Sequence, residues 1–297
     1  MKKISSRQMN AWLLAIFFTG TIATGAYFLT KFVAANAEKA ELEYEFTEDD
    51  GHASPDEDAA KEDVAEKKDH GGGHEWGYEG SAGPEHWGEL SEDFKACSAG
   101  NKQSPIDIAA PTPKTKLLPI KFVYKTSEVK LKNNGHSIQG DYEPGSYVEV
   151  DGEPYRLLQF HFHTPSEHKV NGLPYEMEIH LVHKNAKGAL VVIGVLIESG
   201  DENKTLAALV AQLPRATDSE SEGITFNIKA LLPSKRSYYA YSGSLTTPPC
   251  SESVSWYVLT RPNEASDNQI ESFASIMHHN ARPVQTLHGR EILKSKR

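Results

Sequence analysis

The chain has 297 residues, of which 38% are hydrophobic and 24% are charged, and its formal net charge is −10. This composition is that of a globular protein with room for a sizeable core. The acidic balance, without any long run of Lys or Arg, argues against a nucleic-acid-binding protein. Two cysteines are too few for a disulfide scaffold or a four-cysteine zinc site, whereas thirteen histidines could supply a histidine-based site.

The first 37 residues have the pattern of an export segment. They carry four basic residues and no acid, and residues 11–30 form an uncharged apolar run. A run of about twenty residues is long enough to cross a bilayer as a helix, and would anchor the protein in the membrane. Alternatively, the small residues Ala35 and Ala37 flank Asn36 in a cleavage pattern that would release the chain. In both cases the rest of the chain is expected to be exported to the periplasm or cell envelope.

Residues 38–73 are predicted to be an acidic, disordered linker. Between residues 38 and 69 there are fourteen acidic residues and four lysines, with few aromatic or β-branched side chains. Such a segment cannot bury enough apolar surface to offset the entropy that it loses on ordering. Its histidines and the adjacent His74 are interpreted as solvated side chains rather than a metal-collecting tract.

Residues 74–297 have an even, globular composition, which predicts one mainly β (α+β) domain. Short β-branched or aromatic runs predict strands at 121–124, 147–150, 157–163, 176–183, 189–197 and 254–260. Turn signals separate these runs at 134–135, 151–152, 171–172 and 248–249. The two clearest helices are predicted at 203–212 and 264–277.

Histidines recur at alternate positions of two predicted strands. Alternation in the strand 157–163 places three polar side chains on one face: Gln159, His161 and His163. Alternation in the strand 176–183 places four side chains on one face: Glu176, Glu178, His180 and Val182. The connecting stretch 164–175 contains two prolines and Asn-Gly, so the strands can return as antiparallel neighbours. Three imidazoles could then converge.

Three converging imidazoles are typical of a catalytic zinc site. They leave the fourth tetrahedral position open to water, and imidazole nitrogen suits Zn²⁺ better than Mg²⁺ or Ca²⁺. A ligand histidine also needs its second nitrogen held, and Glu178 and Gln159 lie one alternation from His180 and His161. The alternative is a solvated or core-packed pair of histidines. A third in-phase histidine with an acid beside it argues against that alternative.

The domain 74–297 resembles the α-class carbonic anhydrases, and in particular their bacterial, exported members. Eight blocks carry the resemblance in order: HEWGYEG from residue 74, GPEHWGEL from 83, NKQSPIDI from 101, NNGHSIQ from 133, LLQFHFHTPSEH from 157, EMEIHLVH from 176, SGSLTTPPCSESVSWYVL from 242 and NARPVQ from 280. The resemblance implies a single domain around a large, twisted, mostly antiparallel central sheet with a few short peripheral helices. Thr164, Pro165 and Ala281 depart from the animal pattern and follow the bacterial one.

The resemblance implies reversible hydration of carbon dioxide to bicarbonate and a proton, through zinc-bound hydroxide. The zinc ligands would be His161, His163 and His180, with Gln159 and Glu178 as hydrogen-bond acceptors for His161 and His180. Thr246 would accept from the hydroxide and donate to Glu167, and His136 would shuttle protons. The shuttle's water chain would be lined by Tyr78, Asn134 and Gln139. The carbon dioxide pocket would be lined by Val182, Val192, Leu245, Thr247, Val254 and Trp256.

The resemblance also implies that Cys97 and Cys250 form a disulfide, because these positions pair in exported members; the alternative is two buried free thiols. The remaining histidines match no ligand role and are interpreted as structural or solvated: His86, His168, His183, His278, His279 and His288. Two other functions compete, namely a different zinc hydrolase such as an esterase, and an inactive carbonic-anhydrase-like binding module. Retention of all three ligands argues against the module. A monomer and a homodimer both stay open.

Overall fold

The computed structural model describes residues 76–114 and 117–296. The strands in these ranges are β1 (Asp107–Ile108), β2 (Thr112–Lys114), β3 (Lys121–Val123), β4 (Ser127–Val129), β5 (Leu131–Asn133), β6 (Ile138–Asp141), β7 (Tyr147–Val150), β8 (Glu153–His163), β9 (Lys169–Val170), β10 (Leu173–Pro174), β11 (Met177–Lys184), β12 (Leu190–Ser199), β13 (Ser219–Glu220), β14 (Ile224–Phe226), β15 (Tyr238–Ser244), β16 (Glu252–Leu259), β17 (Asn263–Ala265) and β18 (Leu293–Ser295). The helices are η1 (Gly80–Ala82), α2 (Trp87–Leu90), η2 (Glu92–Phe94), α3 (Ala96–Ala99), α4 (Lys204–Val210), η3 (Ile228–Leu231) and α5 (Asp267–Met277).

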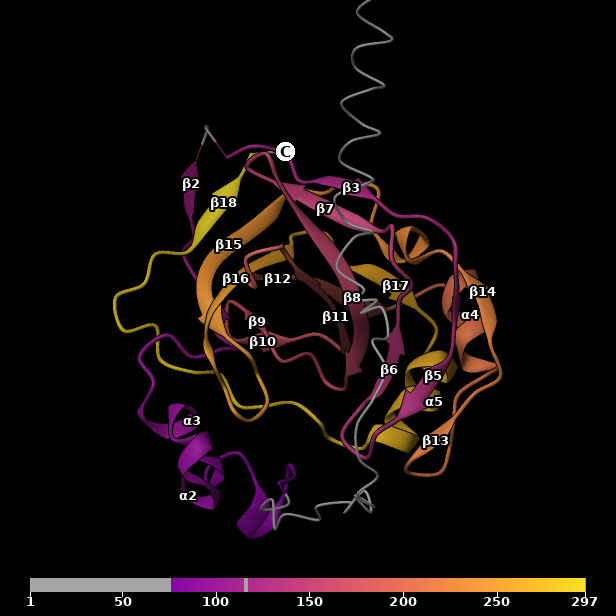
Figure 1. The fold of residues 1–297 in the computed structure, drawn as a ribbon, viewed down its shortest axis with the longest axis horizontal. Coiled ribbons are helices and arrows are strands. Elements are labelled where there is room, and N and C mark those ends of the chain that lie inside the picture. The colour runs from indigo at the N-terminus through magenta and orange to yellow at the C-terminus, as the bar shows by residue number, and fades with distance from the viewer. Residues whose placement is uncertain (1–75, 115–116, 297) are drawn as a thin grey trace, which may run out of the picture. The chain divides into compact units, whose positions relative to one another are not determined.

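A 13-stranded mixed sheet runs through this part of the chain, and β8, β11, β12 and β16 lie side by side at its centre (Figure 1). Most neighbouring strands are antiparallel, whereas β12 pairs in parallel with β16 and β17, and β18 pairs in parallel with β2. The short helices lie at the periphery. The predicted fold class, a mostly antiparallel central sheet with few helices, is therefore confirmed.

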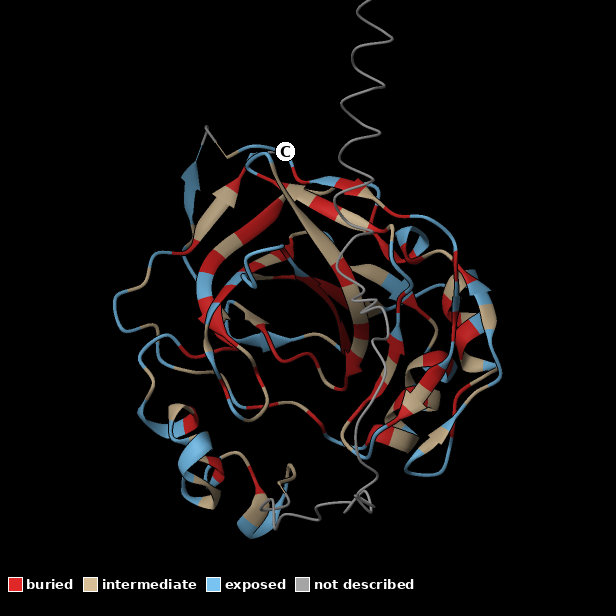
Figure 2. Cartoon of the chain, viewed as in Figure 1, coloured by how far each residue is buried: buried red, intermediate tan, exposed pale blue. Residues whose placement is uncertain are grey.

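Alternation along the central strands divides the core between the two faces of the sheet. Phe160, Phe162 and Ile179 belong to the larger hydrophobic cluster, which also receives Phe273 of α5. Val182 and Trp256 belong to a second cluster. Because successive side chains point to opposite faces, His161, His163 and His180 point away from the larger cluster. Figure 2 shows buried residues along these strands.

The two predicted helices exist, but the start of the second one was predicted wrongly. The predicted helix 203–212 corresponds to α4, whose N-cap residue Asn203 accepts hydrogen bonds from two backbone N–H groups. The predicted helix 264–277 begins only at Asp267. Its first residues belong to β17, which pairs with β12, and Ser266 forms a capping box with Gln269. The capping box satisfies the first N–H groups and fixes the start of the helix.

Turn residues define where the central hairpins reverse. Asp151 and Gly152 both have positive φ, at 51° and 86°, and they connect β7 to β8. β8 begins at Glu153, four residues before the predicted strand, because its first residues pair with β7. The predicted turn 171–172 also has positive φ at both residues, 51° and 83°. Asn, Asp and Gly tolerate this region best, which explains these turn signals.

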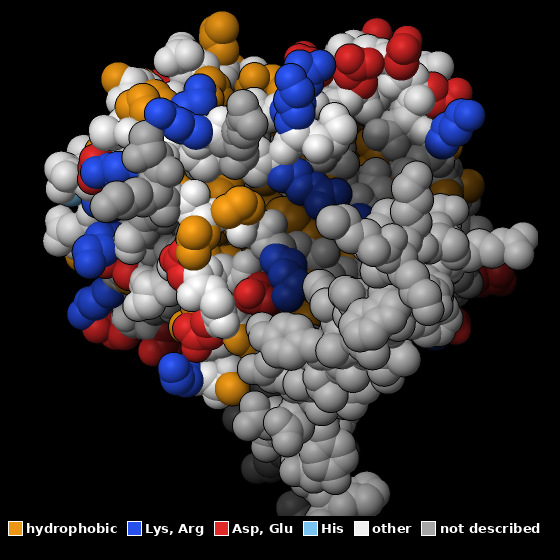
Figure 3. Space-filling view, turned by 90° about the horizontal axis from the view of Figure 1, so that it is seen from above, with side chains coloured by type: hydrophobic (Ala, Val, Ile, Leu, Met, Phe, Trp, Pro, Cys, Tyr) orange, Lys and Arg blue, Asp and Glu red, His pale blue; other side chains and the backbone are white. Residues whose placement is uncertain are grey.

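Lys and Arg side chains are interspersed with Asp and Glu on the face shown in Figure 3. Among the described residues, ion pairs join strands or loops, as between Lys121 and Glu149 and between Lys114 and Glu291. No helix within residues 76–114 and 117–296 is long and apolar enough to cross a membrane. The predicted export segment 1–37 and the predicted linker 38–73 lie outside the described residues.

Candidate metal centre

Three imidazoles converge where β8 and β11 pair. The two strands are antiparallel, and their register places His180 opposite His161 and Glu178 opposite His163. One ring nitrogen from each of His161, His163 and His180 lies within 4.8 Å of the others. His163 and His180 are only 1% exposed, and His161 is half-buried. The connecting loop therefore brings the two strands back as neighbours, and the three side chains can serve one ion.

Hydrogen bonds hold the outer nitrogens of two of the rings, and a carboxylate lies beside the outer nitrogen of the third. Nδ1 of His161 donates to Oε1 of Gln159 over 2.8 Å, and Nδ1 of His163 donates to the backbone carbonyl of Asn280 over 2.8 Å. Nε2 of His180 lies 3.1 Å from Oε1 of Glu178. Each contact orients its ring, so Nε2 of His161 and His163 and Nδ1 of His180 are the nitrogens left for a metal.

The atoms at the centre of this cluster lack partners of their own. Nε2 of His163 and Oε2 of Glu167 are buried and have no hydrogen-bond partner among the described residues. These two atoms are 3.6 Å apart, and Oε2 of Glu167 is 3.9 Å from Nδ1 of His180. Buried polar atoms without partners cost free energy, but this arrangement is expected of atoms that receive a ligand. The donor set therefore fits a tetrahedral ion with three imidazole ligands, such as Zn²⁺.

The charge states around the cluster also suit a metal. Burial lowers the pKa of His161 well below its usual value, and burial likewise lowers the pKa of His163. For Glu178, burial alone would raise the pKa, but His168 and His180 outweigh it and hold the pKa well below its usual range. Neutral imidazoles beside an ionised carboxylate are the state that binds a divalent cation.

Glu178 has a second partner, His168, that was not predicted from the sequence. His168, predicted to be structural or solvated, is fully buried. Its Nδ1 donates to Oε1 of Glu178 over 2.8 Å, and its backbone N–H donates to Oε2 over 2.9 Å. The signal in the sequence was the pair Glu167-His168 in the stretch between the two histidine strands. Asn280 was also missed as the partner of His163, although it lies within the block NARPVQ.

A Gly194→Ala substitution is expected to disturb this carboxylate. Gly194 lies opposite His180 on β12, and an added Cβ would approach Oε1 of Glu178 to 2.7 Å. We expect zinc affinity to fall about 10–100-fold, the cost of disturbing a partner of a ligand, and stability to fall by about 1–3 kcal/mol. Zinc affinity is measured by competition with a chelator.

Gly140→Ala is the matched control for that experiment. Its Cβ would approach Cζ of Phe160 to 2.5 Å, so it overpacks the larger hydrophobic cluster instead of the metal centre. A similar loss of stability with unchanged zinc affinity is expected. Equal zinc affinities for the two variants would contradict the expectation that a Cβ at residue 194 disturbs Glu178.

Thr246 and Glu167 do not form the hydrogen bond that the family resemblance implied. Thr246 is buried, but Oε2 of Glu167 has no hydrogen-bond partner among the described residues. Oε1 of Glu167 accepts from the backbone N–H of Arg282 over 2.9 Å. Oε2 is turned toward His163 and His180, which explains why this contact is missing.

An apolar wall lies beside the imidazoles. Val182, Val192, Val254 and Trp256 are each at most 9% exposed and belong to one cluster, against which Leu245 packs. The ring of Trp256 lies 4.8 Å from that of His180, centroid to centroid. Five of the six residues predicted for the substrate pocket are thus in one cluster; the sixth, Thr247, is half-buried.

His136 lies in the turn between β5 and β6 and is half-buried. Its ring stacks on Trp76 with centroids 3.7 Å apart and planes 8° apart. The side chain of Asn134 accepts hydrogen bonds from the backbone N–H groups of His136 and Ser137, so it stabilises the turn.

Gln139 lies opposite His161 across β6 and β8. Burial raises the pKa of Tyr78 well above its usual value, with a further contribution from Glu167.

Cys97 and Cys250 are joined by a disulfide, as expected. The buried guanidinium of Arg282 donates to the backbone carbonyls of Cys97 and Ser104, each over 2.7 Å, and to Oε1 of Gln103 over 2.9 Å. Burial lowers the pKa of Arg282 to about 10. Since the backbone of Arg282 also holds Glu167, the disulfide segment is tied to the metal centre.

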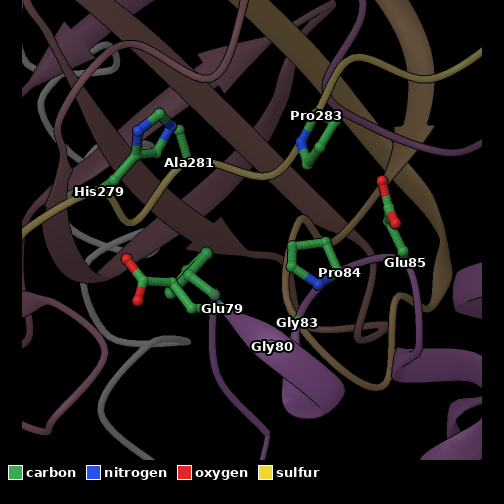
Figure 4. A pocket seen from close by; sticks show the side chains of 9 residues that line it. Glu79, Gly80, Gly83, Pro84, Glu85, His279, Ala281 and Pro283 are labelled. Carbon is green, nitrogen blue, oxygen red and sulfur yellow. The ribbon is translucent and has the colours of Figure 1, made fainter.

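A pocket of about 330 Å³ lies between residues 78–85 and residues 279–283, which follow α5. Figure 4 shows Glu79 and Pro84 on one side of it, and His279, Ala281 and Pro283 on the other. Ala281, which departs from the animal pattern, presents only a methyl group here.

The large mixed sheet and its imidazole cluster define a mainly β protein that offers three ring nitrogens to one ion. Residues 82–296 match the family described as eukaryotic-type carbonic anhydrase. A carbonic anhydrase of Klebsiella pneumoniae is 47% identical over 223 residues, which cover 74% of this chain and 90% of that protein. The chain therefore belongs to the carbonic anhydrases, a family of enzymes that hydrate carbon dioxide.

Solved structures agree with this assignment. The α-carbonic anhydrase of Thermovibrio ammonificans, solved in complex with the inhibitor sulfanilamide, matches with a TM-score of 0.73 and 44% identity, covering 74% of this chain and 99% of that one. Dioscorin, solved in complex with ascorbate, matches with a TM-score of 0.70 and 28% identity, covering 74% and 97%. Because the fold also hosts a protein solved with ascorbate, the site residues must support the activity.

Proposed function

We propose that this chain catalyses the reversible hydration of carbon dioxide to bicarbonate and a proton, with one Zn²⁺ held by His161, His163 and His180. The observation that carries the proposal is the convergence of three ring nitrogens within 4.8 Å. Each ring has its other nitrogen beside a separate acceptor. A bound zinc ion supplies a nucleophile at neutral pH, since it lowers the pKa of its water to about 7, a value established on carbonic anhydrases themselves.

The residues around the centre orient the reactants. The cluster with Val182 and Trp256 offers an apolar surface to a small, neutral substrate. Oε2 of Glu167 faces His163 and His180 and has no hydrogen bond to Thr246, so no orienting role is assigned to that pair.

Stopped-flow measurement of carbon dioxide hydration, with and without a chelator, tests the function. We expect hydration activity to disappear when the chelator removes zinc and to return when zinc is added back. A folded, zinc-loaded protein without hydration activity would instead indicate a binding module built on this fold.

His136→Ala is expected to lower kcat by about tenfold or more, in line with general acid–base contributions. His136 would carry the proton away after bicarbonate is released, so kcat/KM should stay nearly unchanged. Small imidazole buffers should restore much of the lost rate, because a diffusing base can replace a tethered one. Stopped-flow kinetics across a buffer series measure both effects.

His288→Ala, which alters an exposed histidine, is the control and should behave like the unaltered protein in every buffer. Removing the stack between His136 and Trp76 could lower stability by itself. Such a loss of stability would not be restored by imidazole buffer. An unchanged kcat of His136→Ala in dilute buffer would rule out the shuttle.

We further propose that the enzyme acts outside the cytoplasm. Two observations support this: the apolar run 11–30 behind a basic N-terminus, and the disulfide, which persists in oxidising compartments. Retention of residues 11–30 would anchor the domain in the membrane. Cell fractionation followed by mass spectrometry of the N-terminus tests both points. Recovery of the protein in the cytosol with free thiols would contradict the proposal.

A further inference from the structure

A line of buried polar groups leads away from the metal centre, from β11 to β15. Nε2 of His180 lies 3.1 Å from Oε1 of Glu178, which accepts from Nδ1 of His168 over 2.8 Å. Nε2 of His168 lies 2.6 Å from the hydroxyl of Tyr241, and that hydroxyl lies 2.9 Å from Oγ of Ser104. All five residues are at most 5% exposed, so water cannot replace these partners.

Both nitrogens of the His168 ring have a buried partner. Nδ1 carries the proton that meets the carboxylate of Glu178, and Nε2 lies beside the hydroxyl of Tyr241. That hydroxyl donates to Oγ of Ser104, which also accepts from the backbone N–H of Ser244. The line therefore continues without a break from Glu178 to Ser244.

This arrangement restrains the carboxylate that faces His180. Both oxygens of Glu178 accept from His168, one from the ring and one from the backbone N–H. A carboxylate fixed at both oxygens stays 3.1 Å from Nε2 of His180, so Nδ1 is the nitrogen of that ring that is left for the metal. The orientation of the His168 ring depends in turn on Tyr241, the partner of its other nitrogen.

The same line reaches the strand that leads to Thr246. The backbone N–H of Ser104 donates to Oγ of Ser244 over 2.9 Å, and the backbone N–H of Ser244 donates back to Oγ of Ser104 over 3.1 Å. Ser244 ends β15 two residues before Thr246. Tyr241 therefore lies between the segment of Thr246 and the ligand His180.

We propose that Tyr241 is a positioning residue for His180, acting through His168 and Glu178. The inference rests on the proposed zinc site. Loss of the hydroxyl leaves Nε2 of His168 buried without its hydrogen-bond partner, which destabilises the ring orientation that Glu178 requires.

Tyr241→Phe tests the inference, with the zinc dissociation constant measured by chelator competition at a temperature where the variant is folded. Disturbing a direct partner of a ligand costs about 10–100-fold in affinity. Because Tyr241 is one step further away, we expect zinc to bind about three- to tenfold more weakly. Zinc affinity is the decisive readout, because a merely structural role would lower the melting temperature alone.

Tyr238→Phe is the matched control. Tyr238 lies on the same strand, is 2% exposed, and donates its hydroxyl to the backbone carbonyl of Leu118 over 2.7 Å. It should lose comparable stability while its zinc affinity stays unchanged. Should Tyr241→Phe not fold, Ser104→Ala removes the acceptor of the Tyr241 hydroxyl, and a smaller weakening of zinc binding is expected.

The inference would be overturned if a folded Tyr241→Phe bound zinc with unchanged affinity. Where that variant does not fold, unchanged zinc affinity in Ser104→Ala would overturn it. An equal loss of zinc affinity in Tyr238→Phe would also overturn it. These outcomes differ from a failure of the proposed function. In that case the unaltered protein would itself bind no zinc.

Discussion

His180→Ala is expected to lose zinc and carbon dioxide hydration together. Two imidazoles and water form a poor tetrahedral site, and the vacated position would leave Glu178 buried without the ring beside it. Zinc affinity should fall by more than about 100-fold, beyond the usual cost of disturbing a ligand's partner. Metal content after dialysis, measured together with stopped-flow hydration, gives the result.

His183→Ala serves as the matched control. His183 lies three residues further along β11, is fully buried, and its Nε2 is 2.8 Å from the hydroxyl of Tyr124. Burial lowers its pKa to about 3. Its removal should cost stability but leave stoichiometric zinc in the folded protein. If His180→Ala retained stoichiometric zinc and near-normal turnover, His180 would have to be removed from the ligand set.

Replacing both Cys97 and Cys250 by Ser is expected to cost up to about 5 kcal/mol of stability. The disulfide closes a loop with a sequence separation of 153, and in the chain-entropy model a loop of this size restricts the unfolded chain by about that amount. The melting temperature should fall by about 10–20 °C, at about 2–4 °C per kcal/mol for a domain of this size. Calorimetry of the oxidised protein and the double variant measures the shift.

Activity at low temperature separates the disulfide's effect on stability from an effect on the site. The guanidinium of Arg282 holds the carbonyls of Cys97 and Ser104 without help from the sulfur atoms. The double variant should therefore keep most of its hydration rate while it is folded. Thiol labelling of denatured, unreduced protein from the cell envelope is a further check. Two labelled thiols per chain would show that the bond does not form there.

The sequence by itself determined the faces of the central strands. Alternation is a local, two-residue property of a strand, so it separated His161 and His163 from Phe160 and Phe162 before any pairing was known. Turn signals at Asp151 and Gly152 were equally local, because few residues tolerate positive φ. The family assignment followed from eight sequence blocks, which the fold and the comparisons confirm.

The tertiary structure alone decided how the imidazoles are held and which partners they share. The carbonyl that orients His163 belongs to Asn280, 117 positions away, and no local pattern reports such a contact. The start of α5 was mispredicted because pairing of β17 with β12 competes with the helical pattern. Glu178 binds His168 as well as facing His180, and Glu167 turns toward the imidazoles instead of Thr246. Each of these outcomes depends on strand register and on long-range packing, which only the folded chain establishes.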